Sequence, residues 1–251
     1  MIALLKHHGI EASDIVGFVL ERRNKNGGFS ASPGIPADIQ DTYYALKVLN
    51  SFSSITSERL NYHPSKDYPL KKYLSGATLN NNIKPKILYF YIKSCEMVNI
   101  NICAEKFYYL LSSCELEDQF YLSKIFNKHL IPVKKWGTIK ELSMYLHLNP
   151  NINKSEKHKL IHWIYSCQNP DGGFGFLPNS TSFVENTYFA LKAISYLKES
   201  TDIQDVSIRR ALNFILSCYT GKGGFARKDG GAPLLEATYY SVSALLLITT
   251  P

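Results

Sequence analysis

The chain has 251 residues, of which 45% are hydrophobic and 20% charged, so it can bury a sizeable core and is neither disordered nor a small disulfide scaffold. Lys and Arg outnumber Asp and Glu by 28 to 21, a formal net charge of +7, which suits an anionic partner without specifying a chemistry. No apolar run reaches the roughly 18 to 20 residues of a membrane span, and none of the cysteine pairs has CxxC spacing, so we expect a cytoplasmic protein with reduced thiols and no transmembrane segment.

Taken in chain order, the predicted elements are helices that pair into αα hairpins. The outer helix of each pair is expected near residues 13–23, 67–75, 118–129, 154–167 and 203–219. The inner helix is expected near residues 38–52, 84–98, 137–148, 182–198 and 233–249. Residues 100–115 could add a further helix, so the pattern predicts five or six hairpins. Repeated hairpins must stack to bury their apolar faces, which favours a closed double ring.

One loop and one helix start occur three times along the chain. In each copy a loop ends in Gly-Gly-Phe and the next helix opens with Thr-Tyr. The loop Phe and the helix Tyr are separated by 14 positions in each copy: Phe29 and Tyr43, Phe174 and Tyr188, and Phe225 and Tyr239. A degraded copy is visible around Tyr89, and another would centre on residues 140–148. Such fixed spacing predicts one supersecondary unit used repeatedly.

Two of these copies resemble a known repeat. The stretch from Arg210 to Phe225, and the one from Trp163 through Gln168 to Phe174, resemble the QW-type repeat of squalene and oxidosqualene cyclases and of protein prenyltransferase β subunits. Tyr219 stands where the pattern has Gln, and Phe replaces the closing Trp. The resemblance implies an all-α fold, an α/α toroid formed by residues 1–251 as a single domain. It also implies a central aromatic cavity that accepts an isoprenoid chain, whereas the alternative, favoured for any single Tyr, is that these aromatic residues only pack one helix ring on the other.

Cyclases of this kind begin by protonating an olefin or epoxide with a DxDD motif, which this sequence lacks. Its nearest counterpart is Asp38-Ile-Gln-Asp41, whose spacing places both carboxylates on one face of a helical turn. Two close carboxylates raise one pKa and leave a proton donor, whereas the alternative is that they only cap a helix. Glu185 and Glu236 precede the Thr-Tyr pairs of two other copies. We therefore predict Asp38, Asp41, Glu185 and Glu236 as candidate catalytic residues, acting as acids or holding Mg²⁺.

Prenyltransferases instead use zinc to activate a thiolate, and the resemblance places their ligands just before the helix Tyr. These positions hold Gln40, Glu185 and Glu236, and Thr42, Thr187 and Thr238. Thr is not a zinc ligand, so zinc is not expected here.

The resemblance also implies that a basic residue after the loop aromatic and the helix Tyr contact a diphosphate. We predict Tyr43, Tyr188, Tyr239, Arg227 and Lys228 as substrate-binding residues, the alternative for the two cations being a solvated loop. The predicted function is that of an isoprenoid-handling enzyme performing cyclisation or prenyl transfer. The alternative is a non-catalytic toroid module that works with a helical partner subunit. Basic pairs are scattered rather than aligned in a stripe, so no nucleic-acid partner is expected.

Overall fold

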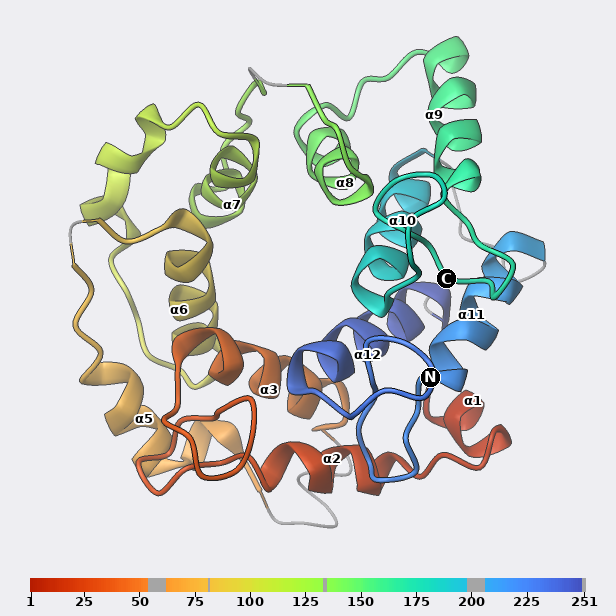
Figure 1. The fold of residues 1–251 in the computed structure, drawn as a ribbon. Coiled ribbons are helices and arrows are strands. Elements are labelled where there is room, and N and C mark those ends of the chain that lie inside the picture. The colour runs from red at the N-terminus through yellow and green to blue at the C-terminus, as the bar shows by residue number, and fades with distance from the viewer. Residues whose placement is uncertain (54–61, 81, 133–134, 198–205, 250–251) are drawn as a thin grey trace.

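The computed structural model describes residues 1–53, 62–80, 82–132, 135–197 and 206–249, and the regular elements within them are helices. Six helices form an inner ring: α3 (Ile39–Ser51), α6 (Pro85–Met97), α7 (Leu116–Phe126), α8 (Ile139–Leu148), α10 (Val184–Leu197) and α12 (Leu235–Thr249). Each packs against the next, and α12 packs against α3, so the ring is closed (Figure 1).

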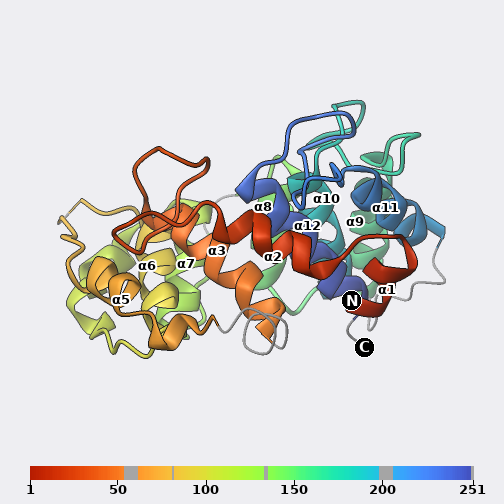
Figure 2. The same ribbon diagram turned by 90° about the horizontal axis from the view of Figure 1, so that it is seen from below.

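The other elements lie outside this ring. They are α1 (Ile2–His7), α2 (Ala12–Leu20), α5 (Tyr68–Ser75), α9 (Lys154–Ser166), α11 (Val206–Ser217) and the short 3-10 helices η1 (Pro64–Lys66) and η2 (Ala104–Ser112). Helices α2, α5, η2, α9 and α11 each cover an inner helix, and the long hairpin loops gather on one side of the ring (Figure 2). This double ring is an all-α α/α toroid, as the sequence predicted.

The middle of the chain differs from the predicted map. We predicted an outer helix near 118–129, but α7 belongs to the inner ring and packs between α6 and α8. Its partner on the outside is η2, so residues 100–115 supply the outer element of the α7 hairpin rather than an additional hairpin. The physical reason is that α7 carries the buried rings Phe120 and Tyr121 toward its neighbours, while its start lacks the Thr-Tyr pair. The predicted helix residues 198 and 203–205 lie outside the described part of the chain.

The constant spacing of the three matching copies has a structural cause. In each copy the Thr hydroxyl before the Tyr accepts a hydrogen bond from the loop Phe N–H at 3.0 Å, in the pairs Phe29–Thr42, Phe174–Thr187 and Phe225–Thr238. The same hydroxyl donates to the carbonyl four residues earlier in its helix, as Thr42 does to Asp38 at 2.6 Å. These hydrogen bonds attach the loop to the start of the inner helix, so the number of residues between the loop Phe and the helix Thr stays the same in all three copies.

The glycines of these loops let each hairpin rest on the next outer helix. Gly172 has φ +91°, and a Cβ there would overlap the carbonyl oxygen of Arg210 on α11. Gly223 has φ +83°, and a Cβ there would overlap the carbonyl oxygen of Asp14 on α2. The loop before α12 therefore packs on a helix near the other end of the chain, which joins the last hairpin to the first on the outside of the ring.

Candidate functional site

The centre of the ring is filled by a layer of aromatic rings. Five of the six inner helices place two adjacent aromatic residues there: Tyr43 and Tyr44, Tyr89 and Phe90, Phe120 and Tyr121, Tyr188 and Phe189, and Tyr239 and Tyr240. The rings contact one another across helices, with Tyr43 stacked on Phe90 and Tyr44 stacked on Tyr239, both at 4.5 Å between centroids. In α8 the same positions hold Ser143 and Met144.

These rings and Lys124 enclose a cavity of about 40 Å³. That volume holds about one water molecule, whereas sites for drug-sized ligands usually span roughly 300–1,000 Å³. The three predicted substrate-binding tyrosines, Tyr43, Tyr188 and Tyr239, are brought together in this layer. Burial raises the pKa of all three hydroxyls well above the usual range, so they remain protonated donors.

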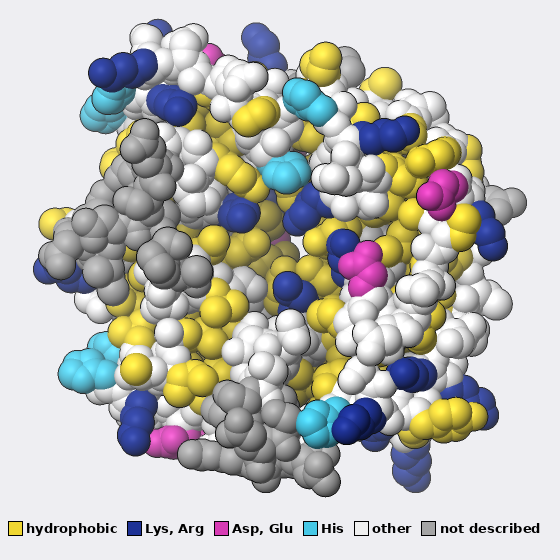
Figure 3. Space-filling model, turned by 180° about the vertical axis from the view of Figure 1, so that it is seen from behind, with side chains coloured by type: hydrophobic (Ala, Val, Ile, Leu, Met, Phe, Trp, Pro, Cys, Tyr) yellow, Lys and Arg dark blue, Asp and Glu magenta, His cyan; other side chains and the backbone are white. Residues whose placement is uncertain are grey.

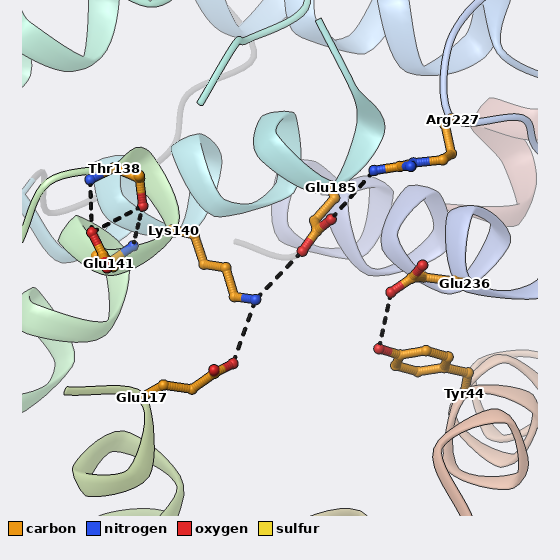
Figure 4. A network of polar contacts seen from close by, with 8 residues as sticks. All are labelled: Tyr44, Glu117, Thr138, Lys140, Glu141, Glu185, Arg227 and Glu236. Carbon is orange, nitrogen blue, oxygen red and sulfur yellow. Dashed lines mark hydrogen bonds and ion pairs between the residues drawn. The ribbon is translucent and has the colours of Figure 1, made fainter. Parts of the chain in front are cut away.

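On the side of the hairpin loops, a layer of charged groups lies at the entrance to the ring (Figure 4). The second residue of several inner helices supplies it. Lys140 of α8 places its Nζ 3.4 Å from Glu117 Oε1 of α7 and 3.7 Å from Glu185 Oε1 of α10. Glu236 of α12 accepts a hydrogen bond of 3.3 Å from the Tyr44 hydroxyl, which connects this layer to the aromatic one.

Two of the predicted acids, Glu185 and Glu236, therefore meet at one entrance. The sequence analysis missed their neighbours Glu117 and Lys140, because α7 and α8 belong to the degraded copies. Their shared position in the helix could have revealed them, because Glu117, Lys140, Glu185 and Glu236 are each the second residue of an inner helix. The carboxylate of Glu185 also lies 4.0 Å from Arg227 Nη2, so two cations already face it.

Asp38 and Asp41 lie in different surroundings at the start of α3. Asp38 caps α3, because its Oδ1 accepts the Asp41 N–H at 2.7 Å. Asp41 is only 8% exposed. Burial, followed by the nearby charges of Asp38 and Glu236, raises the pKa of the Asp41 carboxyl to about 7. This group can therefore hold and release a proton near neutral pH.

Arg227 and Lys228 are not joined to Tyr239 by the described contacts. Both are exposed on the loop before α12. The Arg227 guanidinium lies over the Phe183 ring at 4.6 Å and near Glu185, while Tyr239 stacks on Tyr44 in the aromatic layer. An anion site made of these three groups remains a prediction.

The opposite end of the ring carries a basic layer that the sequence analysis also missed. It consists of the residues four positions after the first member of each central pair: Lys47, Lys93, Lys124, His147 and Lys192. The sequence contains Tyr-x-Ala-Leu-Lys in α3 and α10, the first and fifth inner helices, but only the helix register shows that these lysines lie at one level along the axis. Figure 3 shows Lys and Arg side chains gathered around a central hollow on this face.

The residues present do not fit the zinc site of the prenyltransferases. Among the described residues, no group of three or more His, Cys, Asp and Glu side chains lies close enough to hold a metal ion. The hydroxyls of Thr42, Thr187 and Thr238, at the position of the thiolate ligand, are hydrogen-bonded to the loops instead.

The closed inner ring, the outer helices that cover it and the aromatic centre define a protein of the α/α toroid class. Residues 1–67 and 66–250 match the family described as the prenyltransferase alpha-alpha toroid domain. The chain therefore belongs to this family, which supports a prenyl-related function in general. Within the described ranges, the helices are too short or too polar to cross a bilayer.

Proposed function

We propose that this protein binds a prenyl diphosphate or a polyprene along the aromatic axis of its ring and promotes carbocation chemistry there. The observation that carries the proposal is the aromatic layer, in which ten rings from five helices face one another at the centre. The π face of an aromatic ring attracts a cation, by about 2 kcal/mol or more where water is excluded. The family to which the chain belongs supports the isoprenoid as substrate class.

Asp41 supports a route that begins with protonation. Its carboxyl has a pKa of about 7 and lies on α3, next to the helix that carries Glu236. Transfer of its proton to one carbon of a double bond leaves the positive charge on the other carbon, where the rings can stabilise it. This route uses groups that the chain possesses and does not need the zinc ligands that it lacks.

The size of the cavity places a condition on this proposal. Because about 40 Å³ cannot hold an isoprenoid, some rings of the aromatic layer must turn away when the ligand enters. Ligand binding should therefore change the near-ultraviolet circular dichroism of the tyrosines as well as the melting temperature.

A panel of farnesyl diphosphate, geranylgeranyl diphosphate and squalene tests the proposal. A ligand at 100 times its dissociation constant should stabilise the fold by about 2.7 kcal/mol. Extraction and chromatography should then detect a cyclised or transferred product that Asp41→Asn no longer forms. Absence of any thermal shift and any product across the panel would refute the proposal.

The second candidate is a non-catalytic toroid module that acts with a helical partner subunit. The filled axis favours it, because a ring packed by its own side chains needs no substrate to be stable. A prenyl-independent partner recovered with the protein, together with no product, would support this candidate. In either case we propose that residues 1–251 act as one domain in the cytoplasm, in keeping with five free cysteines.

A further inference from the structure

The basic layer lies at the end of the ring opposite to the acids. Its members come from five successive inner helices, α3, α6, α7, α8 and α10, and occupy one helical position. Because these helices run side by side in a closed ring, equal positions lie at one level around the axis. The sixth helix, α12, places Ser243 there. The basic layer is therefore a ring of four lysines and one histidine, interrupted by a serine.

The lysines of this layer have few acidic partners among the described residues. Lys93 pairs with Glu96 at 2.7 Å. Lys124 places its Nζ 4.9 Å from the centres of the Tyr89 and Phe120 rings. The amino group of Lys192 lies over the Tyr196 ring at 5.2 Å. Aromatic faces moderate a positive charge but do not cancel it, so within the described part of the chain most of the positive charge of the layer has no counter-charge.

The lysines are close enough to act on one another. Burial, followed by the charges of Lys192, Lys47 and Lys93, lowers the pKa of Lys124 to about 8. His147 has a pKa lowered by burial and by Lys124 and Lys192, and its Nδ1 lies 3.1 Å from the Tyr196 hydroxyl. Four like charges held together at a partly buried site cost stability unless a counter-ion joins them.

The shape of this face suits such a counter-ion. The molecule is hollowed at its centre, with cationic side chains around a hydrophobic floor (Figure 3). Lys124 belongs both to the basic layer and to the lining of the central cavity, so the floor of the hollow is continuous with the aromatic layer. Lysine ammonium groups act as point donors to phosphate oxygens, and several of them are needed for an anion with several charges.

We propose that the basic layer is a binding site for a multivalent phosphate anion, a diphosphate group in particular, which enters from the end of the ring opposite to the hairpin loops. This site is separate from the exposed loop of Arg227 and Lys228. It does not require that the protein transform an isoprenoid. The diphosphate could be free or could be the head group of a prenyl diphosphate whose tail contacts the aromatic layer.

Calorimetric titration with inorganic pyrophosphate at low salt tests the site. We compare wild type with Lys47→Met and Lys192→Met, and with Lys159→Met as a control that removes an exposed lysine from the outer helix α9. Wild type and control should bind alike, and each variant of the basic layer should bind at least tenfold more weakly. Lys192→Arg should retain binding, because it keeps the charge.

Misfolding is separable from loss of the site. Without ligand, Lys47→Met and Lys192→Met should melt no lower than wild type, since each removes like-charge repulsion. Equal pyrophosphate affinity in all variants, or no binding by folded wild type, would overturn the proposal.

A second titration, with farnesyl diphosphate, distinguishes the two sources of the anion. Tighter binding than pyrophosphate, lost in the same variants, assigns the site to the head group of a prenyl diphosphate. Equal affinity assigns it to free diphosphate. Both outcomes support the anion site whatever the turnover assay gives, so this proposal and the proposed function can fail independently.

Discussion

Replacing Lys124 by Met should stabilise the protein, although Lys124 lies in the last turn of the inner helix α7 and contacts two aromatic rings. The methionine keeps an unbranched side chain of similar length, which can still pack against those rings. What it removes is a buried charge that three other lysines repel.

The magnitude follows from the pKa of the ammonium group, which falls from its ordinary value of 10.5 to about 8 in the folded protein. At about 1.4 kcal/mol for each tenfold change in proton affinity, the charged form costs the folded state about 3 kcal/mol. Loss of the two cation–π contacts offsets about 1 kcal/mol of the gain. We expect the free energy of unfolding at pH 7 to rise by about 2 kcal/mol, or about 4–8 °C in melting temperature for a domain of this size.

The pH dependence has a defined sign. Below pH 8 Lys124 is charged in both the folded and the unfolded state, so the full cost is present. Between pH 8 and 10 the folded protein loses the proton first, so the unfolded state binds more protons and stability rises with pH. Lys47 and Lys192, whose pKa values are also lowered by burial, add smaller terms of the same sign.

Urea unfolding at pH 7.0 and pH 9.5 measures both effects. Wild type and the control Lys159→Met should gain stability between these pH values, and Lys124→Met should gain clearly less. If Lys124→Met is less stable than wild type at pH 7, or gains as much stability with pH, the repulsion argument is wrong.

Three further substitutions test other parts of the structure. Asp41→Asn removes a carboxyl whose pKa is raised to about 7 and whose ionisation therefore lowers stability as pH rises from 4 to 7. The variant should have a higher melting temperature than wild type at pH 8 and the same melting temperature at pH 4. Equal melting temperatures of variant and wild type at both pH values would contradict the raised pKa. Thr238→Val leaves the buried N–H of the Gly-Gly-Phe loop without its acceptor and should cost about 1–3 kcal/mol in urea unfolding, whereas Thr238→Ser should cost about 1 kcal/mol; equal losses would show that the hydroxyl is dispensable. Gly223→Ala forces a Cβ into the Asp14 carbonyl and should lower the melting temperature far more than Gly221→Ala, where φ is also positive but the space is open; similar losses would mean that this contact does not hold the ring.

The sequence predicts the fold well where the repeat is intact, because local chemistry there enforces the structure. The Thr hydroxyl, the loop Phe and the two glycines must keep their spacing for the loop to bind its own helix and the next one. Those constraints are visible as identical letters in the chain. They are absent around α7, where a 3-10 helix replaces the usual outer helix, so the same reasoning placed α7 in the wrong ring.

The candidate site is predictable in its components and not in its assembly. The sequence identifies Glu185, Glu236 and the inner tyrosines as residues at the start of inner helices, and the structure brings the two acids to the entrance on the loop side and the tyrosines to the centre of the axis. It does not reveal that Lys140 pairs with Glu117 and Glu185, since these contacts join three helices. Nor does it reveal that the aromatic rings fill the axis, because the remaining volume depends on side-chain rotamers rather than on spacing.

Closure of the ring has a consequence for how the molecule opens and refolds. Helices α3 and α12 are adjacent, and Tyr44 and Glu236, which join them, are 192 positions apart in sequence. In an open array of repeats the terminal units fray first, since each lacks a neighbour on one side. Here the first and last inner helices protect each other, so their amide hydrogens should exchange as slowly as those of α7 and α8. Packing of α12 against α3 joins segments that are separated by most of the chain, and such contacts have a large loop-closure entropy. We therefore expect this closure to be the slow step of folding.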